Sequence, residues 1–249
     1  MSRQYLILVL QAPLIAYGDE AIDRRRPTDS LPGKSMLTGL LGNALGYRRQ
    51  DADKLEDLQR RLEYAARSET GQYLNGIRDF HTARLGIDDR AWTTYGKPEG
   101  RAGDRKNPQV TETREVHYLA ETASVVALTL RDPSKSPSLG ELLEAVKKPA
   151  RPLFIGRKCC IPERPVFERM INAESATEAL HLTPAVTGQA SAQVQWDEPE
   201  EHDSVKLTHQ TWVSDLKDWD NGIHVGRRLV KRGVQTLTVA QPHEAGAGT

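Results

Sequence analysis

The segment of residues 32–46 constrains the fold most, because its pattern requires a helix with two unlike faces. Leu37, Leu41 and Leu45 recur four residues apart, which predicts an apolar stripe that packs on a core. The second stripe has almost no side chain and consists of Ser35, Gly39, Gly42 and Gly46. Glycine inside a helix costs roughly 1 kcal/mol relative to alanine. We therefore expect another backbone, of protein or of a polyanion, to approach the glycine face closely.

Lys34 lies at the amino end of this helix, where free N–H groups and the helix dipole favour an anion. The tripeptide Gly33-Lys34-Ser35 looks like the end of the phosphate-binding loop of nucleotide hydrolases. That motif requires a glycine five residues before Gly33, and Thr28 stands there instead. The spacing thus argues against a nucleotide-hydrolysing site. A buried helix packed through its glycines would explain the leucine face but not the basic residues on both sides.

Composition bounds the class of protein without naming a partner. The chain has 249 residues, enough for one large domain or two small ones, and 34 basic residues balance 34 acidic ones. The charges are unevenly placed: residues 23–49 hold six Lys/Arg against two Asp, whereas residues 170–205 hold seven acidic residues and neither Lys nor Arg. This segregation is compatible with a basic groove and an acidic flank, and equally with charged faces that never meet.

The sequence offers little for a metal, a disulfide framework or a membrane. Cys159 and Cys160 are adjacent, which excludes a disulfide framework or a zinc site and favours a reduced, cytoplasmic protein. We interpret both cysteines as buried packing residues. No segment reaches the ~20 apolar residues of a membrane span. We therefore expect no membrane contact, no metal and no cofactor.

Apolar periodicity and turn residues predict the order of elements along the chain. We expect strands at residues 5–10, 76–82, 110–119, 123–130, 209–212 and 226–239, and helices at residues 32–46, 51–66 and 138–146. The first strand is apolar throughout and should be buried on both sides. The strands at 110–119 and 123–130 should form a hairpin, and Ser138 with Glu141 predicts a capping box. This order favours an α+β, ferredoxin-like fold of the RNA-recognition type.

Residues 83–109 form the least globular part of the sequence. They contain four glycines, two prolines, six Arg or Lys residues and the aromatic residues Trp92 and Tyr95. Cations for phosphates and flat rings for bases are what a single-stranded nucleic acid requires. A disordered surface loop has the same composition, so the residues alone leave both interpretations open. We also expect a disordered tail from Pro242 onward.

Several segments, taken together and in order, resemble one family. They are Tyr5-Leu-Ile-Leu with Gln11-Ala-Pro and Ala16-Tyr-Gly18, Arg26-Pro-Thr28, Pro32-x-Lys-Ser-x-Leu-x-Gly-Leu-Leu-Gly-x-Ala-Leu-Gly46, Arg78-Asp-Phe-His-Thr82, Thr113-Arg-Glu-x-x-Tyr-Leu119 and Pro152-Leu-Phe-Ile-Gly-Arg-Lys-Cys159. They span residues 5–170 and are similar to the CasD-type subunits of Cascade, the type I-E CRISPR surveillance complex. After residue 170, little beyond the strand-like residues 226–233 resembles this family.

The resemblance implies a non-enzymatic, cytoplasmic, RNA-binding subunit of an antiviral ribonucleoprotein. It would hold the 5′ handle of the CRISPR RNA, cap the filament of backbone subunits, contact the large subunit and lie near target DNA at the seed end. The implied RNA-recognition-like body comprises residues 1–82 and 111–190. Residues 83–110 would be an inserted thumb hairpin, and residues 191–249 a small β-rich C-terminal region with a disordered tail.

Cations that can neutralise phosphates, and polar or aromatic residues near them, are our candidates for RNA binding. Tyr17, His81 and Trp92 are candidates for stacking on a base. The full set of RNA-binding candidates is Tyr17, Arg24, Arg25, Arg26, Lys34, Ser35, Arg48, Arg49, Arg78, His81, Thr82, Arg105, Lys106, Arg114, Arg157 and Lys158.

The alternative hypothesis is a metal-independent endoribonuclease that processes CRISPR repeat RNA. Such cleavage needs a general base, a general acid and a cation for the phosphate, and the chain could supply them from His81, His117, Tyr47, Tyr118, Lys34 and Lys106. Relatives in type I-C systems cleave CRISPR RNA with tyrosine, lysine and histidine. Here His117 follows Val116 and not a lysine, so the resemblance favours a subunit with no catalytic residue.

Overall fold

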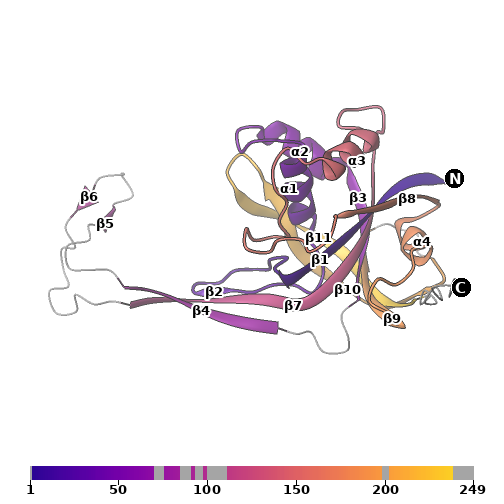
Figure 1. Cartoon of the computed structure of the whole chain (residues 1–249). Coiled ribbons are helices and arrows are strands. Elements are labelled where there is room, and N and C mark those ends of the chain that lie inside the picture. The colour runs from indigo at the N-terminus through magenta and orange to yellow at the C-terminus, as the bar shows by residue number, and fades with distance from the viewer. Residues whose placement is uncertain are drawn as a thin grey trace, which may run out of the picture.

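The computed structural model describes residues 2–69, 76–84, 91–92, 98–99, 111–197 and 202–237. Within these ranges a nine-stranded sheet forms the body, with the strand order β10-β11-β9-β3-β7-β1-β8; β2 and β4 pair with β7 outside this path (Figure 1). The strands are β1 (Arg3–Ile15), β2 (Arg25–Arg26), β3 (Leu62–Ser68), β4 (Gly76–Arg84), β5 (Ala91–Trp92), β6 (Pro98–Glu99), β7 (Thr111–Leu130), β8 (Phe167–Ala173), β9 (Ser191–Trp196), β10 (Val205–Asp218) and β11 (Ile223–Thr236). The helices are α1 (Lys34–Ala44), α2 (Ala52–Arg61), α3 (Leu139–Lys147) and α4 (Ala176–His181).

The sheet is mostly antiparallel, with few helices, and β1 runs through its middle. The prediction that residues 5–10 are buried on both sides is confirmed, since β1 lies between β7 and β8 and its side chains from Tyr5 to Leu10 are inaccessible to solvent. Alternate residues of β1 enter two different cores. Leu6, Leu8 and Leu10 join the larger core, which includes residues of α1, α2 and α3. Ile7 and Val9 join a smaller core that includes residues of α4.

The predicted hairpin of residues 110–119 and 123–130 is wrong, because both segments belong to the single long strand β7. Glu121, with φ of 51°, interrupts its regular conformation without reversing the chain. The half of β7 after this point pairs with β3, from Ser68 opposite Ser124 to Leu62 opposite Leu130. The half before it pairs with β4. The paired β4 and β7 extend away from the body as a two-stranded ribbon (Figure 1).

The predicted helix of residues 51–66 is half right, since α2 ends at Arg61 and the chain continues directly as β3. The guanidinium of Arg61 is buried and donates to the Asp57 carboxylate at 2.8 Å and to the Pro137 carbonyl at 3.1 Å, which fixes the end of the helix. Ala65 and Ala66 then lie between β7 and β9. Tertiary pairing overrides the helix propensity of these alanines here.

The remaining element predictions mostly hold. Strands occur at 76–84, 205–218 and 223–236, and α3 begins with the predicted capping box, in which Ser138 Oγ accepts from the Glu141 N–H. Strands β9, β10 and β11 continue the main sheet because β9 pairs with β3. The predicted tail from residue 242, and the predicted thumb except for residues 83–84 and the small β5–β6 pair, lie outside the described residues. None of the described helices is long and apolar enough to cross a membrane.

Candidate nucleic-acid interface

The N-terminus of α1 binds an anion, as its sequence suggests, but the anion is a carboxylate of the same chain. Asp215 of β10 accepts a hydrogen bond from the Lys34 N–H at 2.6 Å, and the first turn of α1 has no acidic residue of its own. The pairing joins positions 181 residues apart, so local sequence could not have indicated it. Asp215 satisfies a donor that the helix would otherwise leave without an intrahelical partner.

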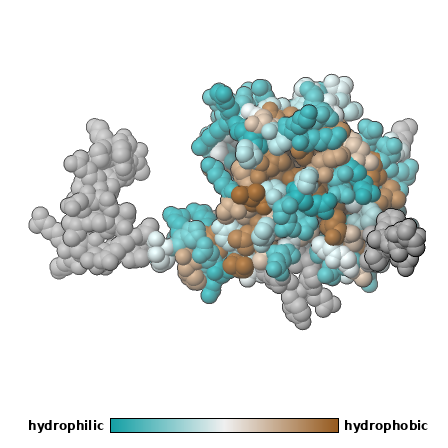
Figure 2. Space-filling view, viewed as in Figure 1, coloured by the Kyte–Doolittle hydropathy of each residue, from teal (hydrophilic) through white to brown (hydrophobic). Residues whose placement is uncertain are grey.

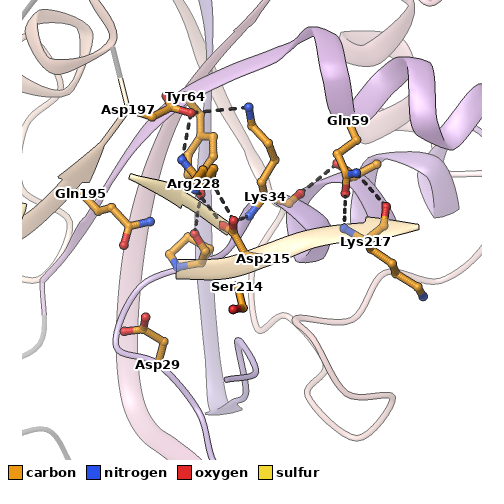
Figure 3. Close-up of polar contacts among 12 residues, drawn as sticks. Asp29, Lys34, Gln59, Tyr64, Gln195, Asp197, Ser214, Asp215, Lys217 and Arg228 are labelled. Atoms are coloured by element: carbon orange, nitrogen blue, oxygen red, sulfur yellow. Dashed lines mark hydrogen bonds and ion pairs between the residues drawn. The ribbon is translucent and has the colours of Figure 1, made fainter. Parts of the chain in front are cut away.

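The Lys34 side chain lies in an ion-pair cluster that fastens the β10–β11 hairpin to α1 (Figure 3). Its ammonium lies 3.5 Å from the Asp197 carboxylate and only 11% of its side chain is exposed. Arg228 of β11 joins the cluster, contacting Asp197 and Asp215 at 2.8 Å each and donating to the Tyr64 hydroxyl at 2.5 Å. Burial lowers the pKa of Lys34, against the opposing effect of Asp197. This cation therefore points into the protein and not toward an external phosphate.

The glycine face of α1 packs on side chains, so the expectation that a protein backbone approaches this face closely is wrong. A Cβ at Gly42 would lie 2.5 Å from Leu55 Cδ2 of α2, whereas a Cβ at Gly39 would lie 3.5 Å from the Trp219 ring, an ordinary contact. Gly46 adopts φ of +80° just beyond the helix, a conformation that favours glycine. The glycines thus let α2 and the β10–β11 turn approach α1.

A cavity of about 870 Å³ opens beside this face, and we call it the basic groove. Its lining contains five cations and, among the described residues, no carboxylate; the cations are Arg48, Arg49, Arg151, Lys158 and Lys217. The other lining residues include the aromatic side chains of Tyr47, Phe154 and Trp219. Three of the five cations were predicted from the sequence. A concave site lined by cations concentrates positive potential and attracts polyanions.

Sequence reasoning missed two of the five cations, Arg151 and Lys217. Arg151 Nε donates to the Asn43 side-chain oxygen at 2.9 Å, and its guanidinium also donates to the Tyr47 carbonyl. The Lys217 ammonium lies 4.4 Å from the Trp219 ring centroid. The position of Arg151 beside α1 depends on Asn43, which lies more than one hundred residues away in the sequence.

A second group of exposed cations lies where the β4–β7 ribbon leaves the body. The parallel pairing of β2 with β7 sets Arg25 opposite Glu115 and Arg26 opposite Val116. The predicted RNA-binding residues that this region exposes are Arg24, Arg25, Arg26, Arg78, His81, Thr82 and Arg114. Figure 2 shows the ribbon as a narrow projection of mixed hydrophilic and hydrophobic residues beside the broad body.

The turn of residues 156–158 joins this ribbon base to the basic groove. Gly156 adopts φ of +86°, and a Cβ there would lie 1.6 Å from the Ala16 carbonyl oxygen, so only glycine fits. Arg157 donates to the carbonyls of His117 at 2.7 Å and Arg26 at 3.1 Å. The next residue, Lys158, lines the groove. The turn thus places one cation against the ribbon base and the next in the groove, and we call the cations of the ribbon base, this turn and the groove together the basic track.

Several other candidates have different surroundings from those expected. Tyr17 is only 6% exposed, and burial raises the pKa of its hydroxyl, so its ring is not accessible for base stacking in this conformation. Cys160 is buried as expected, but Cys159 is exposed, which corrects that interpretation. Ser35 is half-buried beside a second cavity of about 800 Å³. Arg105 and Lys106 lie outside the described residues.

Most of the described groups considered for catalysis are engaged within the protein. Burial raises the pKa of Tyr118, whose ring lies under the Arg157 guanidinium at 4.7 Å. His117 Nε2 lies 2.8 Å from the Glu115 carboxylate, and His81 Nε2 lies 2.7 Å from the Asp79 carboxylate. In the paired register, His81 lies opposite Arg114 and His117 opposite Arg78, so the two histidines point to opposite faces of the ribbon.

Comparison with known proteins places the chain in a family. Residues 5–231 match the model of the family described as CRISPR-associated protein (Cas_Cas5). The chain is 32% identical over 184 residues to the CRISPR system Cascade subunit CasD of Escherichia coli (strain K12), covering 72% of this chain and 76% of the relative.

Two solved structures share the fold. A chain of a CRISPR RNA-guided surveillance complex superposes with a TM-score of 0.63 at 20% identity, covering 96% of this chain and 95% of that one. A crystal structure of a Cas protein gives a TM-score of 0.53 at 23% identity, covering 93% and 92%. On the strength of the family match across the sheet and the basic track, together with its identity to the Escherichia coli subunit, the chain belongs to the Cas5 family of CRISPR-associated proteins.

Proposed function

We propose that this chain is a non-catalytic, RNA-binding subunit of a Cascade-type CRISPR surveillance complex. It holds the 5′ handle of the CRISPR RNA and caps the filament of backbone subunits, with the large subunit and the seed end of the target DNA close by. The basic track is the observation that carries this proposal, because a run of exposed cations without carboxylates in its groove suits a phosphate backbone. Family membership and the likeness to the Escherichia coli Cascade subunit support the assignment to this assembly.

The track divides the work of RNA binding between two regions. At the ribbon base, Arg24 and Arg114 offer exposed cations that neutralise phosphates. In the basic groove, Arg48, Arg49 and Lys158 surround a concavity large enough for part of an RNA strand that folds back on itself. Arg157 acts differently: it fixes the ribbon base to the groove through two carbonyls and positions both halves.

We further propose a ferredoxin-like, RNA-recognition-type body with an inserted thumb. The support is the strand order β8-β1-β7-β3 with helices in the connections from β1 to β3 and from β7 to β8, which is the split βαβ arrangement. Strands β4 and β7 flank the inserted residues, ending with Arg84 opposite Thr111. A hairpin that continues this ladder would carry Arg105 and Lys106 along the bound RNA.

An experiment with a repeat-derived RNA distinguishes an RNA-binding subunit from an endoribonuclease. We expect the purified chain to bind it in a manner that weakens steeply with salt, and to leave it intact for hours. Electrophoretic analysis of the RNA with and without a metal chelator measures cleavage, while fluorescence anisotropy measures binding. Metal-independent products with 2′,3′-cyclic ends, abolished by His81→Ala or His117→Ala, would contradict the non-catalytic assignment. Failure to bind the RNA, alone or in the assembled complex, would contradict the proposal as a whole.

Deletion of residues 90–107 tests the proposed thumb. We expect the body to keep its melting temperature, since residues 90–107 contain no Leu, Ile, Val, Met or Phe and their loss removes little apolar surface. The amount of complex assembled on guide RNA, measured by size-exclusion chromatography, should be reduced. Unchanged assembly and unchanged RNA affinity would contradict the thumb assignment while leaving RNA binding by the track intact.

A further inference from the structure

The loop between β1 and α1 carries three exposed arginines of the basic track without support from apolar packing. Neither of the two cores formed by the described residues contains a side chain from residues 18–30. The two ends of the loop meet, because the Asp29 N–H donates to the Gly18 carbonyl at 2.9 Å. We call residues 18–29 the arginine loop. Since no core sets its conformation, polar contacts with its neighbours must do so.

One side of the arginine loop is attached to the ribbon through its backbone. Arg25 and Arg26 pair with β7 as the short strand β2, which runs beside β7 (Figure 1). The Glu115 N–H also donates to the Arg24 carbonyl at 2.9 Å, and Arg157 donates to the Arg26 carbonyl at 3.1 Å. These contacts use main-chain atoms of the loop and leave its three arginines exposed.

The other side of the arginine loop faces the β10–β11 hairpin. A cavity of about 800 Å³ lies between them, and both Asp29 and Arg232 line it. Arg232 of β11 donates to the Asp29 carboxylate, a contact between positions 203 residues apart. The same guanidinium donates to Gln195 Oε1 of β9 at 2.9 and 3.0 Å, and β11 pairs with β10 and β9 at this residue. Arg232 is therefore a rigid anchor, and Asp29 is the point at which it holds the loop.

Among the described residues, two ion pairs join the arginine loop to the hairpin, and they differ in strength. The side chains of Arg232 and Asp29 are 22% and 25% exposed, and Asp29 also accepts from the Ser30 N–H at 2.6 Å. The side chains of Arg227 and Glu20 are 68% and 56% exposed, and their charged atoms lie 3.7 Å apart. Exposed pairs contribute little, whereas charge-assisted hydrogen bonds between partly buried groups contribute more. The pair of Arg232 and Asp29 is therefore the main attachment.

We propose that Arg232 and Asp29 are positioning residues for RNA binding. Their ion pair holds the arginine loop on the hairpin while β7 holds its other side, so that the three arginines are presented together to the phosphates of one strand. Cations held in place bind more tightly than mobile ones, because less conformational freedom is lost on binding. The inference rests on the proposed RNA-binding function, and it gives the C-terminal hairpin a task in that function.

The substitution Asp29→Asn distinguishes positioning from a direct effect of charge, because the two predict opposite changes in RNA affinity. Removing a carboxylate makes the arginine loop more positive, which by itself would strengthen the binding of RNA. Loss of the attachment should instead weaken the binding of guide RNA to the full chain at least about threefold, measured by fluorescence anisotropy. Arg232→Gln should have a similar effect. The double variant should bind about as weakly as either single variant, because both substitutions break the same contact.

Hydrogen exchange of the RNA-free chain, followed by mass spectrometry, gives a second measurement. The amides of residues 19–27 should exchange at least about threefold faster in Asp29→Asn and in Arg232→Gln than in the parent. The matched control is Arg227→Gln, which removes the same charge from the same strand but breaks only the exposed pair. It should keep loop exchange and RNA affinity within about twofold of the parent. All variants should keep the melting temperature within about 4 °C of the parent.

Weaker RNA binding together with faster loop exchange in both variants supports the inference. Unchanged or tighter RNA binding by Asp29→Asn, an equal loss in Arg227→Gln, or weaker binding without faster loop exchange would overturn it. If Arg232→Gln fails to fold, Asp29→Asn decides alone, since its side chain belongs to neither core. If the parent binds no RNA, the proposed function fails, and loop exchange in the free chain still shows whether the ion pair holds the loop.

Discussion

The two ends of α1 differ in what lies opposite their positive charge. At the amino end, Lys34 and the helix N–H groups meet Asp197 and Asp215, carboxylates from β9–β11 that are half-buried in an ion-pair cluster. Beyond the carboxyl end, Arg48 and Arg49 line a groove whose charged lining residues, among those described, are all cations. Paired buried charges specify and hold a structure, whereas unpaired exposed charges remain available to a ligand. The amino end is therefore structural, and the carboxyl end is the one that we propose binds RNA.

Removing the carboxylate at the amino end should have the largest effect on stability. Asp215→Ala leaves Arg228 and the helix N-terminus without their main partner, and we expect it to lower the free energy of unfolding by about 3 kcal/mol. Asp220→Ala, which removes an exposed carboxylate from the same hairpin, should change it by less than about 0.5 kcal/mol. Urea unfolding followed by circular dichroism measures both. An equally small effect of the two substitutions would show that the amino end is not fastened by this carboxylate.

Removing charge from the groove should affect RNA and leave stability unchanged. The triple variant Arg48→Ala, Arg49→Ala and Lys158→Ala should weaken the binding of guide RNA at least about tenfold at moderate salt, because it removes three phosphate contacts. The salt dependence of binding should also become shallower. The control triple Lys135→Ala, Lys147→Ala and Lys148→Ala removes the same charge from exposed sites around α3. Fluorescence anisotropy at several salt concentrations measures the RNA affinity of both triple variants. Equal affinities of the two would mean that only the total charge matters and would contradict a contact at the groove.

Substitutions at two glycines of α1 test how tightly the neighbouring side chains pack on its glycine face. Gly42→Ala forces the Leu55 side chain to shift and should cost about 1–3 kcal/mol of stability. Gly39→Ala meets the Trp219 ring at an ordinary distance and should stabilise the helix by up to about 1 kcal/mol. Thermal unfolding of both variants gives the order. Equal effects would mean that α2 does not press on the glycine face as tightly as the structure shows.

The loss of stability at low pH should depend on carboxylates in ion pairs and not on the cations of the basic groove. Burial by itself would raise the pKa of Glu63, but hydrogen bonds from Arg131 and Arg3 lower it below the ordinary 4.5. A depressed carboxylate pKa contributes stability that is present above the unfolded value and lost as the pH falls through the folded value. Glu63→Gln should therefore be less stable than the parent at neutral pH, by roughly 1 kcal/mol or less. The difference should shrink as the pH falls below 4.5. A constant difference across this range, measured by urea unfolding, would contradict the role of the ionised carboxylate.

Local patterns predicted the elements whose signals are local. The buried strand β1, the helix α1 with its leucine face and the capping box of α3 follow from the periodicity and the capping residues of their own segments. The two misread segments depended on partners. Residues 62–66 form a strand because β7 and β9 lie beside them. Residues 111–130 form one strand because β4 pairs with its first half, while β1 and β3 pair with the two edges of its second half.

The candidate site shows the same limit. Arg48, Arg49 and Lys158 were found because clustered charge is visible in the sequence, and the structure brings them to one groove. Lys34 looked equivalent in the sequence, but Asp197 and Asp215 reach it from more than 160 residues away. Burial of Tyr17 was also hidden, since it depends on the core that the whole sheet creates. Nothing local distinguishes a paired cation from a free one.

Amine footprinting tests the contrast between the two ends of α1 most directly. The assembled or isolated chain is treated briefly with an amine-acetylating reagent, with and without guide RNA, and modification is quantified by mass spectrometry. We predict that Lys158 reacts readily in the free chain and is protected by RNA, whereas Lys34 reacts slowly in both states because its ammonium lies in the ion-pair cluster. Reactive Lys34 that becomes protected by RNA, with Lys158 unchanged, would contradict the account and place the RNA at the amino end.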